Sequence, residues 1–209
     1  MVKRVEPETK IVLETPTGLV TVYVKWENHM VASINLENVP AFLYRKDLHI
    51  DLAGYGDVSV DIGYGGNFFV LADVHSLGLT ITKDTVNLLR SLSKDILAAA
   101  NKVIKVAHPT NPAINYLDQV LFCQNVPEED GGYLAQCIFG DAQADISPCG
   151  TGTSTRLAQR YFRGLIGLEE TFVQKSVCGG AFHAKGLRET TLGGVPAIVP
   201  YVSCSDVHI

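Results

Sequence analysis

The chain has 209 residues, of which 46% are hydrophobic and 19% charged, so it is long enough for one large globular domain or two small ones. A net charge of −5 argues against a nucleic-acid or anionic-membrane surface, because both would need a basic patch. No apolar run approaches the ~20 residues that a membrane span needs, and the first residues do not resemble a signal peptide, so we expect a cytoplasmic protein.

The first third of the chain predicts strands. A hairpin is expected around Pro16-Thr17-Gly18, because short runs of β-branched residues lie on both sides of this turn. Residues 57–62 alternate between apolar and polar side chains with period two. A glycine-rich turn then leads into the apolar run of residues 68–72. The predicted strands are residues 11–15, 19–24, 30–36, 57–62 and 68–72.

The rest of the chain predicts two helices and further strands. Residues 83–102 carry an apolar stripe at helical spacing, with Thr82 or Asp84 as the N-cap. Residues 133–139 predict a strand that places Cys137 and Phe139 on one face, and residues 152–163 predict a helix ended by Gly164. The pattern favours an α+β fold in which mixed strands wrap around a few helices.

The cysteines number five, and no two have the C-x-x-C spacing. An odd count without this spacing suggests neither a disulfide framework nor a zinc site, so no metal is predicted. Most of these thiols are expected to be small buried side chains.

One segment carries chemistry: Asp145-Ile-Ser-Pro-Cys149-Gly-Thr-Gly-Thr-Ser154. Gly150 and Gly152 let the backbone approach a ligand closely, and the following helix points its free N–H groups at the turn. Such a helix start binds a carboxylate or phosphate, and the same field stabilises a thiolate on Cys149.

Three other interpretations of this segment stay open from the residues alone. Cys149 could be a buried structural thiol in a glycine-rich turn. A nucleotide phosphate loop is disfavoured because the segment lacks the lysine of such loops. A cysteine hydrolase with His183 as its base has no supporting local pattern.

The segment Ser147–Ser154, preceded by Asp145, resembles the second-cysteine motif of the proline racemase family, which also includes hydroxyproline epimerases and hydroxyproline dehydratases. Further segments resemble the family in the same order along essentially the whole chain. These segments are residues 37–43, 61–69, 108–109, 138–140 and 170–172.

The resemblance implies a cofactor-independent isomerase that removes a proton from Cα of proline or hydroxyproline and returns one to the opposite face. Such a reaction needs a base on one face and an acid on the other. Cys149 matches the second of the family's two catalytic cysteines. Gly150, Thr151 and Gly152 match the backbone donors that hold the substrate carboxylate.

Three further positions resemble substrate-binding residues. Asp145 matches an acidic residue for the ring nitrogen, and the alternative is a turn-capping role. Phe139 matches a residue that proline racemases place against the ring, which favours unmodified proline, although a core aromatic is the alternative. Asn67 resembles the glycine–asparagine turn of the related diaminopimelate epimerases. Cys137 is interpreted as core.

Two departures from the family pattern stand out. Ile146 stands where the family usually has arginine, and no Met-Cys-Gly-His segment for the first cysteine occurs in the 209 residues. The resemblance therefore implies a diaminopimelate epimerase-like fold, a mixed sheet or barrel around a central helix, with one complete lobe plus the tail of the other. Residues 1–54 would be remaining strands of the N-terminal lobe, and residues 55–209 the C-terminal lobe.

Two functions compete on this basis. The first is a racemase or epimerase that is incomplete and inactive as this chain alone. The second is a non-catalytic remnant that binds a small carboxylate or serves in assembly. The expected partners are the small-molecule substrate and either a second copy or a missing N-terminal half. A dehydratase is disfavoured, because that branch typically has threonine in place of the second cysteine.

Overall fold

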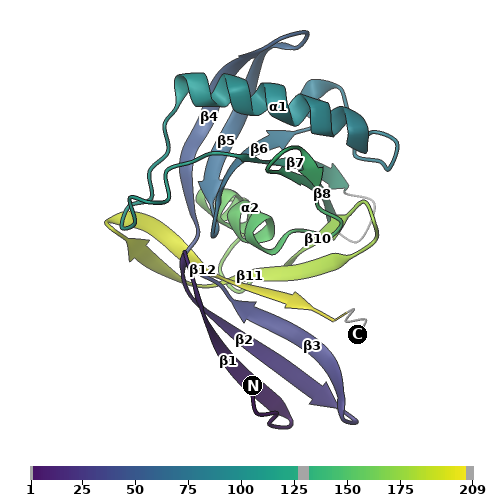
Figure 1. The fold of residues 1–209 in the computed structure, drawn as a ribbon, viewed down its shortest axis with the longest axis vertical. Coiled ribbons are helices and arrows are strands. Elements are labelled where there is room, and N and C mark those ends of the chain that lie inside the picture. The colour runs from purple at the N-terminus through teal and green to yellow at the C-terminus, as the bar shows by residue number, and fades with distance from the viewer. Residues whose placement is uncertain (1, 127–131, 206–209) are drawn as a thin grey trace.

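The computed structural model describes residues 2–126 and 132–205, which form one twelve-stranded sheet and three helices (Figure 1). The helices are η1 (His75–Leu77), α1 (Val86–Val103) and α2 (Gly150–Phe162). The strands are β1 (Glu8–Thr15), β2 (Gly18–Glu27), β3 (Met30–Glu37), β4 (Phe42–Leu52), β5 (Gly56–Tyr64), β6 (Phe68–Asp73), β7 (Gln119–Val126), β8 (Gly132–Phe139), β9 (Gln143–Ala144), β10 (Phe172–Ser176), β11 (Ala181–Leu192) and β12 (Val195–Cys204).

The sheet runs in the order β1-β2-β3-β12-β11-β10-β8-β7-β6-β5-β4, with β9 paired to β8. Most neighbours are antiparallel, but β6 pairs with β7 and β8 with β10 in parallel. Ala41, just before β4, exchanges two backbone hydrogen bonds of 2.8 and 2.9 Å with Ile198 of β12. This bridge closes the strands from β4 to β12 into a ring. The predicted α+β class and mixed sheet are confirmed.

The two α-helices, α1 and α2, lie on opposite sides of the sheet. α2 contacts β4, β5, β6, β11 and β12, whereas α1 contacts β4, β6, β7, β8 and β9 (Figure 1). α1 buries Leu89 and Ile96 in the larger core, and α2 buries Leu157 and Ala158 in a second one. No helix within the described residues is both long and apolar enough to cross a lipid bilayer.

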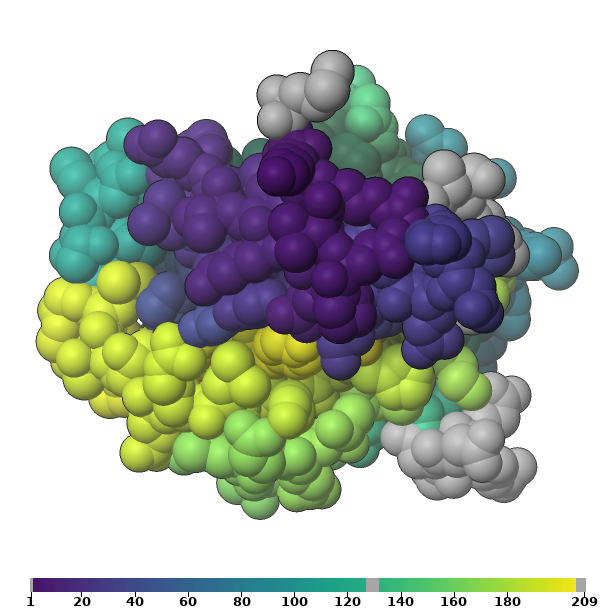
Figure 2. Space-filling model, turned by 90° about the horizontal axis from the view of Figure 1, so that it is seen from below, coloured from purple at the N-terminus to yellow at the C-terminus, as the bar shows by residue number. Residues whose placement is uncertain are grey.

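Strands β1–β3 form an extension of the sheet beyond the ring. β3 pairs with the end of β12, and the predicted hairpin between β1 and β2 is confirmed in full register from Glu8–Lys25 to Thr15–Gly18. Figure 2 views the molecule from this end and shows the purple β1–β3 beside the yellow C-terminal strands. Several large apolar side chains of this extension are exposed, among them Leu13, Leu19 and Met30.

Both predicted α-helices are confirmed, with shifted starts. Thr82, one of the two predicted caps, caps the turn that leads into α1, because its hydroxyl accepts from Thr85 N at 3.3 Å and its own N–H donates to Thr85 Oγ1 at 2.9 Å. α1 itself begins at Val86 after Thr85, so Asp84 is not its N-cap, and Thr85 makes no side-chain capping bond. The hydroxyl of Thr85 donates instead to the carbonyls of Thr80 and Thr82. α2 begins at Gly150, and Gly164 follows its end with a φ of 70°, as a C-terminal glycine does.

A buried ion pair fastens the C-terminal end of α2 to β5. The Asp61 carboxylate, 4% exposed, accepts bonds of 2.6 and 2.7 Å from the guanidinium of Arg163. Gln159 Nε2 and the Asp47 amide donate to it at 2.7 and 2.9 Å. Burial raises the pKa of Asp61, but these four donors outweigh it and hold the pKa below its usual range.

Candidate active site

Cys149 is the N-cap of α2 and has an unusual backbone conformation. Its φ of 65° and ψ of 106° lie where non-glycine residues are rare and strained. The preceding loop holds it there, because Ser147 N donates to Asp145 Oδ1 at 2.8 Å and Cys149 N donates to Ser147 Oγ at 3.0 Å. This conformation turns the sulfur back over the first turn of the helix, where Gly152 N donates to Sγ at 3.3 Å.

The space around the two glycines Gly150 and Gly152 differs. A Cβ on Gly152 would lie 3.0 Å from Cys149 Sγ and 3.2 Å from Leu121 Cδ1, so a larger residue would displace the sulfur. A Cβ on Gly150 would meet nothing within 4 Å. Since Gly152 N is bonded to the sulfur, the amides of Gly150 and Thr151 are those left to bind an anion at this helix start.

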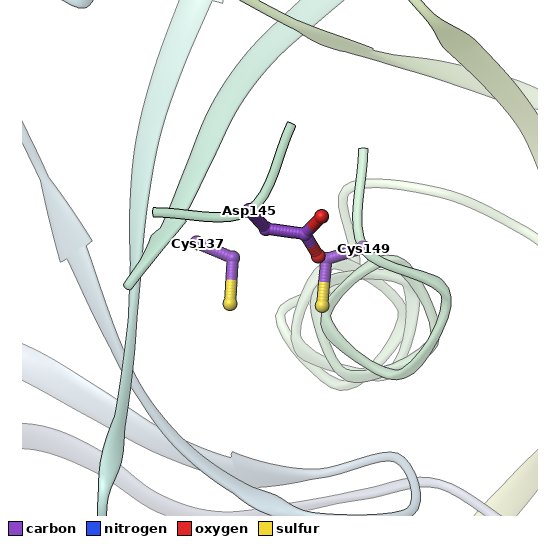
Figure 3. Close-up of side chains that lie close together, drawn as sticks. All are labelled: Cys137, Asp145 and Cys149. Atoms are coloured by element: carbon purple, nitrogen blue, oxygen red, sulfur yellow. The ribbon is translucent and has the colours of Figure 1, made fainter. Parts of the chain in front are cut away.

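Cys137 lies beside Cys149. The two sulfurs and the Asp145 carboxylate lie within 4.8 Å of one another, and the close-up shows both thiols side by side and pointing the same way (Figure 3). Cys137 is 2% exposed and Cys149 7%. The interpretation of Cys137 as a core residue is confirmed. Its position beside the candidate catalytic thiol of Cys149 was not predicted.

The loop between β8 and α2 produces this contact. Asp145 N donates to Cys137 O at 3.0 Å, and Gln136 Nε2 donates to the carbonyls of both residues at 3.0 and 2.8 Å. A signal for this arrangement was present in the sequence. Cys137 shares a strand face with Phe139, which was expected to face the substrate, and Phe139 does pack against the cluster of Cys137 and Cys149.

The two thiols have opposite pKa shifts. The hydrogen bond from the Cys137 thiol is the largest influence that lowers the pKa of Cys149, and Gly152 N–H and the Thr151 hydroxyl add to it, against burial and the charge of Asp145. The same hydrogen bond, together with burial, raises the pKa of Cys137. Both shifts point to a proton shared between the two thiols, with the thiolate form favoured on Cys149 over Cys137.

We expect Cys137→Val to raise the pKa of Cys149 by about one unit, because it removes the neighbouring thiol, which is the largest influence that lowers this pKa. The measurement is the pH midpoint of Cys149 alkylation by iodoacetamide, followed by peptide mass spectrometry. Cys137→Ser retains a donor and should limit the rise. Cys123→Val removes a buried thiol from the neighbouring strand and should leave the midpoint in place. An unchanged midpoint in Cys137→Val would contradict the shared proton.

The other predicted site residues surround this helix start. Asp145 is half-buried, and one of its oxygens caps the turn through Ser147 N. Asn67 ends a turn that lies against α2, since a Cβ on Gly66 would be 2.8 Å from Thr151 Cγ2. Ile146 is 76% exposed.

A metal ion has one candidate set of ligands within the described residues: Cys137, Asp145 and Cys149. Two thiolates and a carboxylate suit a thiophilic divalent ion such as Zn²⁺. The sequence predicted no metal from the spacing of the cysteines and no cofactor from the family resemblance. Cysteine spacing does not detect Cys137 and Cys149 as a pair, because the chain reverses direction between them.

The fold and site together define an α+β protein of the epimerase type, with a cysteine at the start of α2. The family model described as proline racemase matches residues 1–207. The chain belongs to the proline racemase family. Its relatives are named racemases, epimerases and dehydratases, all of them enzymes.

Two curated relatives show the extent of the match. A trans-3-hydroxy-L-proline dehydratase of Burkholderia cenocepacia is 36% identical over all 209 residues, which cover 62% of that protein. A proline racemase of Acetoanaerobium sticklandii is 36% identical over 97% of this chain and 61% of that protein. The chain thus spans somewhat less than two thirds of the length of these relatives.

A solved structure supports the fold directly. A hydroxyproline epimerase from Agrobacterium vitis, with bound trans-4-hydroxy-L-proline, superposes with a TM-score of 0.92 at 32% identity. The superposition covers 98% of this chain and 58% of the epimerase.

Proposed function

We propose that the chain carries one half-site of a proline racemase-type isomerase, in which Cys149 exchanges the Cα proton of proline or hydroxyproline without a cofactor. The observation that carries the proposal is the position of the Cys149 thiol at the start of α2, where its sulfur accepts from Gly152 N at 3.3 Å beside the first-turn amides. The relatives named racemase and epimerase support the isomerase class.

The geometry suits removal of a proton from a carbon next to a carboxylate. Cα–H is a weak acid, so catalysis requires donors that stabilise the charge that develops on the carboxylate as the proton leaves. The Gly150 and Thr151 amides and the positive end of α2 supply such donors on our proposal. Cys149 then takes the proton as thiolate, and the same thiol returns it in the reverse direction.

The remaining substrate contacts are assigned by charge and shape. The unbonded oxygen of Asp145 binds the ring nitrogen, because the carboxylate complements an amine. Phe139, half-buried beside the two thiols, packs against the ring and favours proline over its hydroxylated form. Asn67 borders the carboxylate end of the site. No other thiol in the chain matches a family catalytic position, so the second proton transfer belongs to a base outside these residues.

We further propose that the lobe carrying this site begins near β4. The boundary expected between residues 54 and 55 falls in the hairpin turn between β4 and β5, which pair from Phe42–Tyr64 to Leu52–Gly56. A boundary at residues 38–41, between β3 and the ring, divides fewer hydrogen bonds. Strands β1–β3 then belong to the other lobe, whose exposed apolar side chains suit contact with another chain.

The test is deuterium uptake at Cα in heavy water, followed by NMR with L-proline, D-proline and trans-4-hydroxy-L-proline. We expect the 209-residue chain to exchange one enantiomer of proline without producing the other. Absence of exchange with all three compounds would reject the isomerase, and carboxylate binding without exchange would favour the non-catalytic alternative. A change in the optical rotation of the proline solution would show conversion between enantiomers and would contradict a site with a base on one face only. Loss of water from trans-3-hydroxy-L-proline would indicate the dehydratase reaction.

A further inference from the structure

We propose that Cys137 and Cys149 form a reversible disulfide when a peroxide oxidises the Cys149 thiolate, so that the site is also a redox-controlled one. Both sulfurs lie in the cluster within 4.8 Å of one another, and they come from separate elements, β8 and the start of α2 (Figure 3). The other three free cysteines lie outside this cluster. The cross-link itself needs only the two thiols, but its effect on turnover rests on the proposed function.

The surrounding hydrogen bonds keep the two thiols adjacent. The backbone bond from Asp145 N to Cys137 O and the bridge from Gln136 fix the loop to β8. Gln174 Nε2 donates to Pro148 O at 2.8 Å and fixes the other end of the loop to β10. A disulfide requires the sulfurs, now within 4.8 Å of each other, to approach to about 2.05 Å.

The chemistry starts at Cys149, which is the more exposed of the two thiols. The Cys149 thiolate attacks one oxygen of the peroxide, so that an S–O bond forms, the O–O bond breaks and the departing oxygen takes a proton. Cys149 becomes a sulfenic acid next to the Cys137 thiol. The Cys137 thiol then loses its proton and attacks the Cys149 sulfur; an S–S bond forms, the S–O bond breaks and water leaves.

Two electrons pass from the thiol pair to the peroxide in this sequence, and a dithiol reductant reverses it by thiol–disulfide exchange. Cys137 thus acts as the resolving thiol that protects Cys149 from further oxidation. While the disulfide persists, the Cys149 sulfur is not a thiolate and is too weakly basic to remove a proton from carbon, so Cα exchange stops. Burial favours the intramolecular partner, because both thiols are less than a tenth exposed.

The experiment treats the 209-residue chain with hydrogen peroxide in the presence of EDTA, which removes thiophilic metal ions. Remaining thiols are blocked with N-ethylmaleimide, and the non-reduced digest is analysed by mass spectrometry. We expect one dominant cross-link, between the peptides of Cys137 and Cys149, and its disappearance on treatment with dithiothreitol. Cys178→Ser removes an exposed thiol and should leave the cross-link intact.

Cys137→Val should give no cross-link, and Cys149 should then accumulate as sulfinic or sulfonic acid that dithiothreitol does not restore. Cys137→Ser is the second variant if valine disturbs the fold, which circular dichroism reports. Oxidation of Cys149 in the unmodified chain without this cross-link, or with Cys178 as the main partner, would overturn the proposal. The cross-link is read by mass, so a chain that forms it but exchanges no proline contradicts only the proposed function.

Discussion

Replacement of Cys149 by serine is expected to lower the rate of Cα proton exchange by at least about 100-fold, the usual contribution of a positioned general base. A serine hydroxyl fits the same space and accepts the Gly152 amide, but it remains protonated where a thiol with a lowered pKa is ionised. The measurement is deuterium uptake by proline at a pH where Cys149 of the unmodified chain is thiolate.

The matched control is Cys178→Ser, which removes a thiol exposed on the surface and should exchange at the unmodified rate. Exchange that persists in Cys149→Ser within a factor of a few would mean that another group removes the proton.

The second large effect is expected on stability. Arg163→Met should lower the free energy of unfolding by about 2–4 kcal/mol at pH 7, because it leaves the buried Asp61 carboxylate without its cation. This loss of stability is smaller than for an ion pair with both partners fully buried, because the Arg163 side chain is 29% exposed. Chemical denaturation provides the measurement. Arg188→Met, which breaks a more exposed pair with Glu37, should cost less than about 1 kcal/mol.

This difference should depend on pH with a defined sign. In the unmodified chain the lowered pKa of Asp61 contributes stability above the unfolded pKa of about 3.9, and this contribution is lost as the pH falls through the folded pKa. In Arg163→Met burial favours the protonated acid, so acidification relieves the penalty. The gap between the two proteins should narrow towards pH 4, and a gap that widens on acidification would contradict the role given to Asp61.

Several strands were predicted from alternation or a short apolar run, whereas β4 and β7 were not predicted. β4 has register shifts between Leu43, Arg45 and Leu48, and Asp47 has a φ of 48°, so its side chains do not alternate regularly. β7 lies between β6 and β8, and four consecutive residues from Val120 to Cys123 are buried, which gives a continuous apolar run. Neither pattern has the period-two signal on which the prediction depended.

One part of the candidate site could likewise be predicted from the sequence, and another part could not. The glycines and helix start around Cys149 are local, so the sequence alone predicted that Cys149 lies at the start of a helix. The contact with Cys137 depends on reversal of the chain between β8 and α2, where Gly140 and Ala142 adopt positive φ angles of 53° and 56°. Closure of the ring by Ala41 and Ile198 likewise joins residues that no local pattern connects.

The most direct test of the central claim is the rate of Cys149 alkylation by iodoacetamide as a function of pH, with and without L-proline. The account predicts a midpoint below that of the same cysteine in the urea-unfolded chain, and protection by proline but not by pyrrolidine, which lacks the carboxylate. A midpoint at or above the unfolded value, or equal protection by both compounds, would contradict a thiolate base beside a carboxylate site at the start of α2.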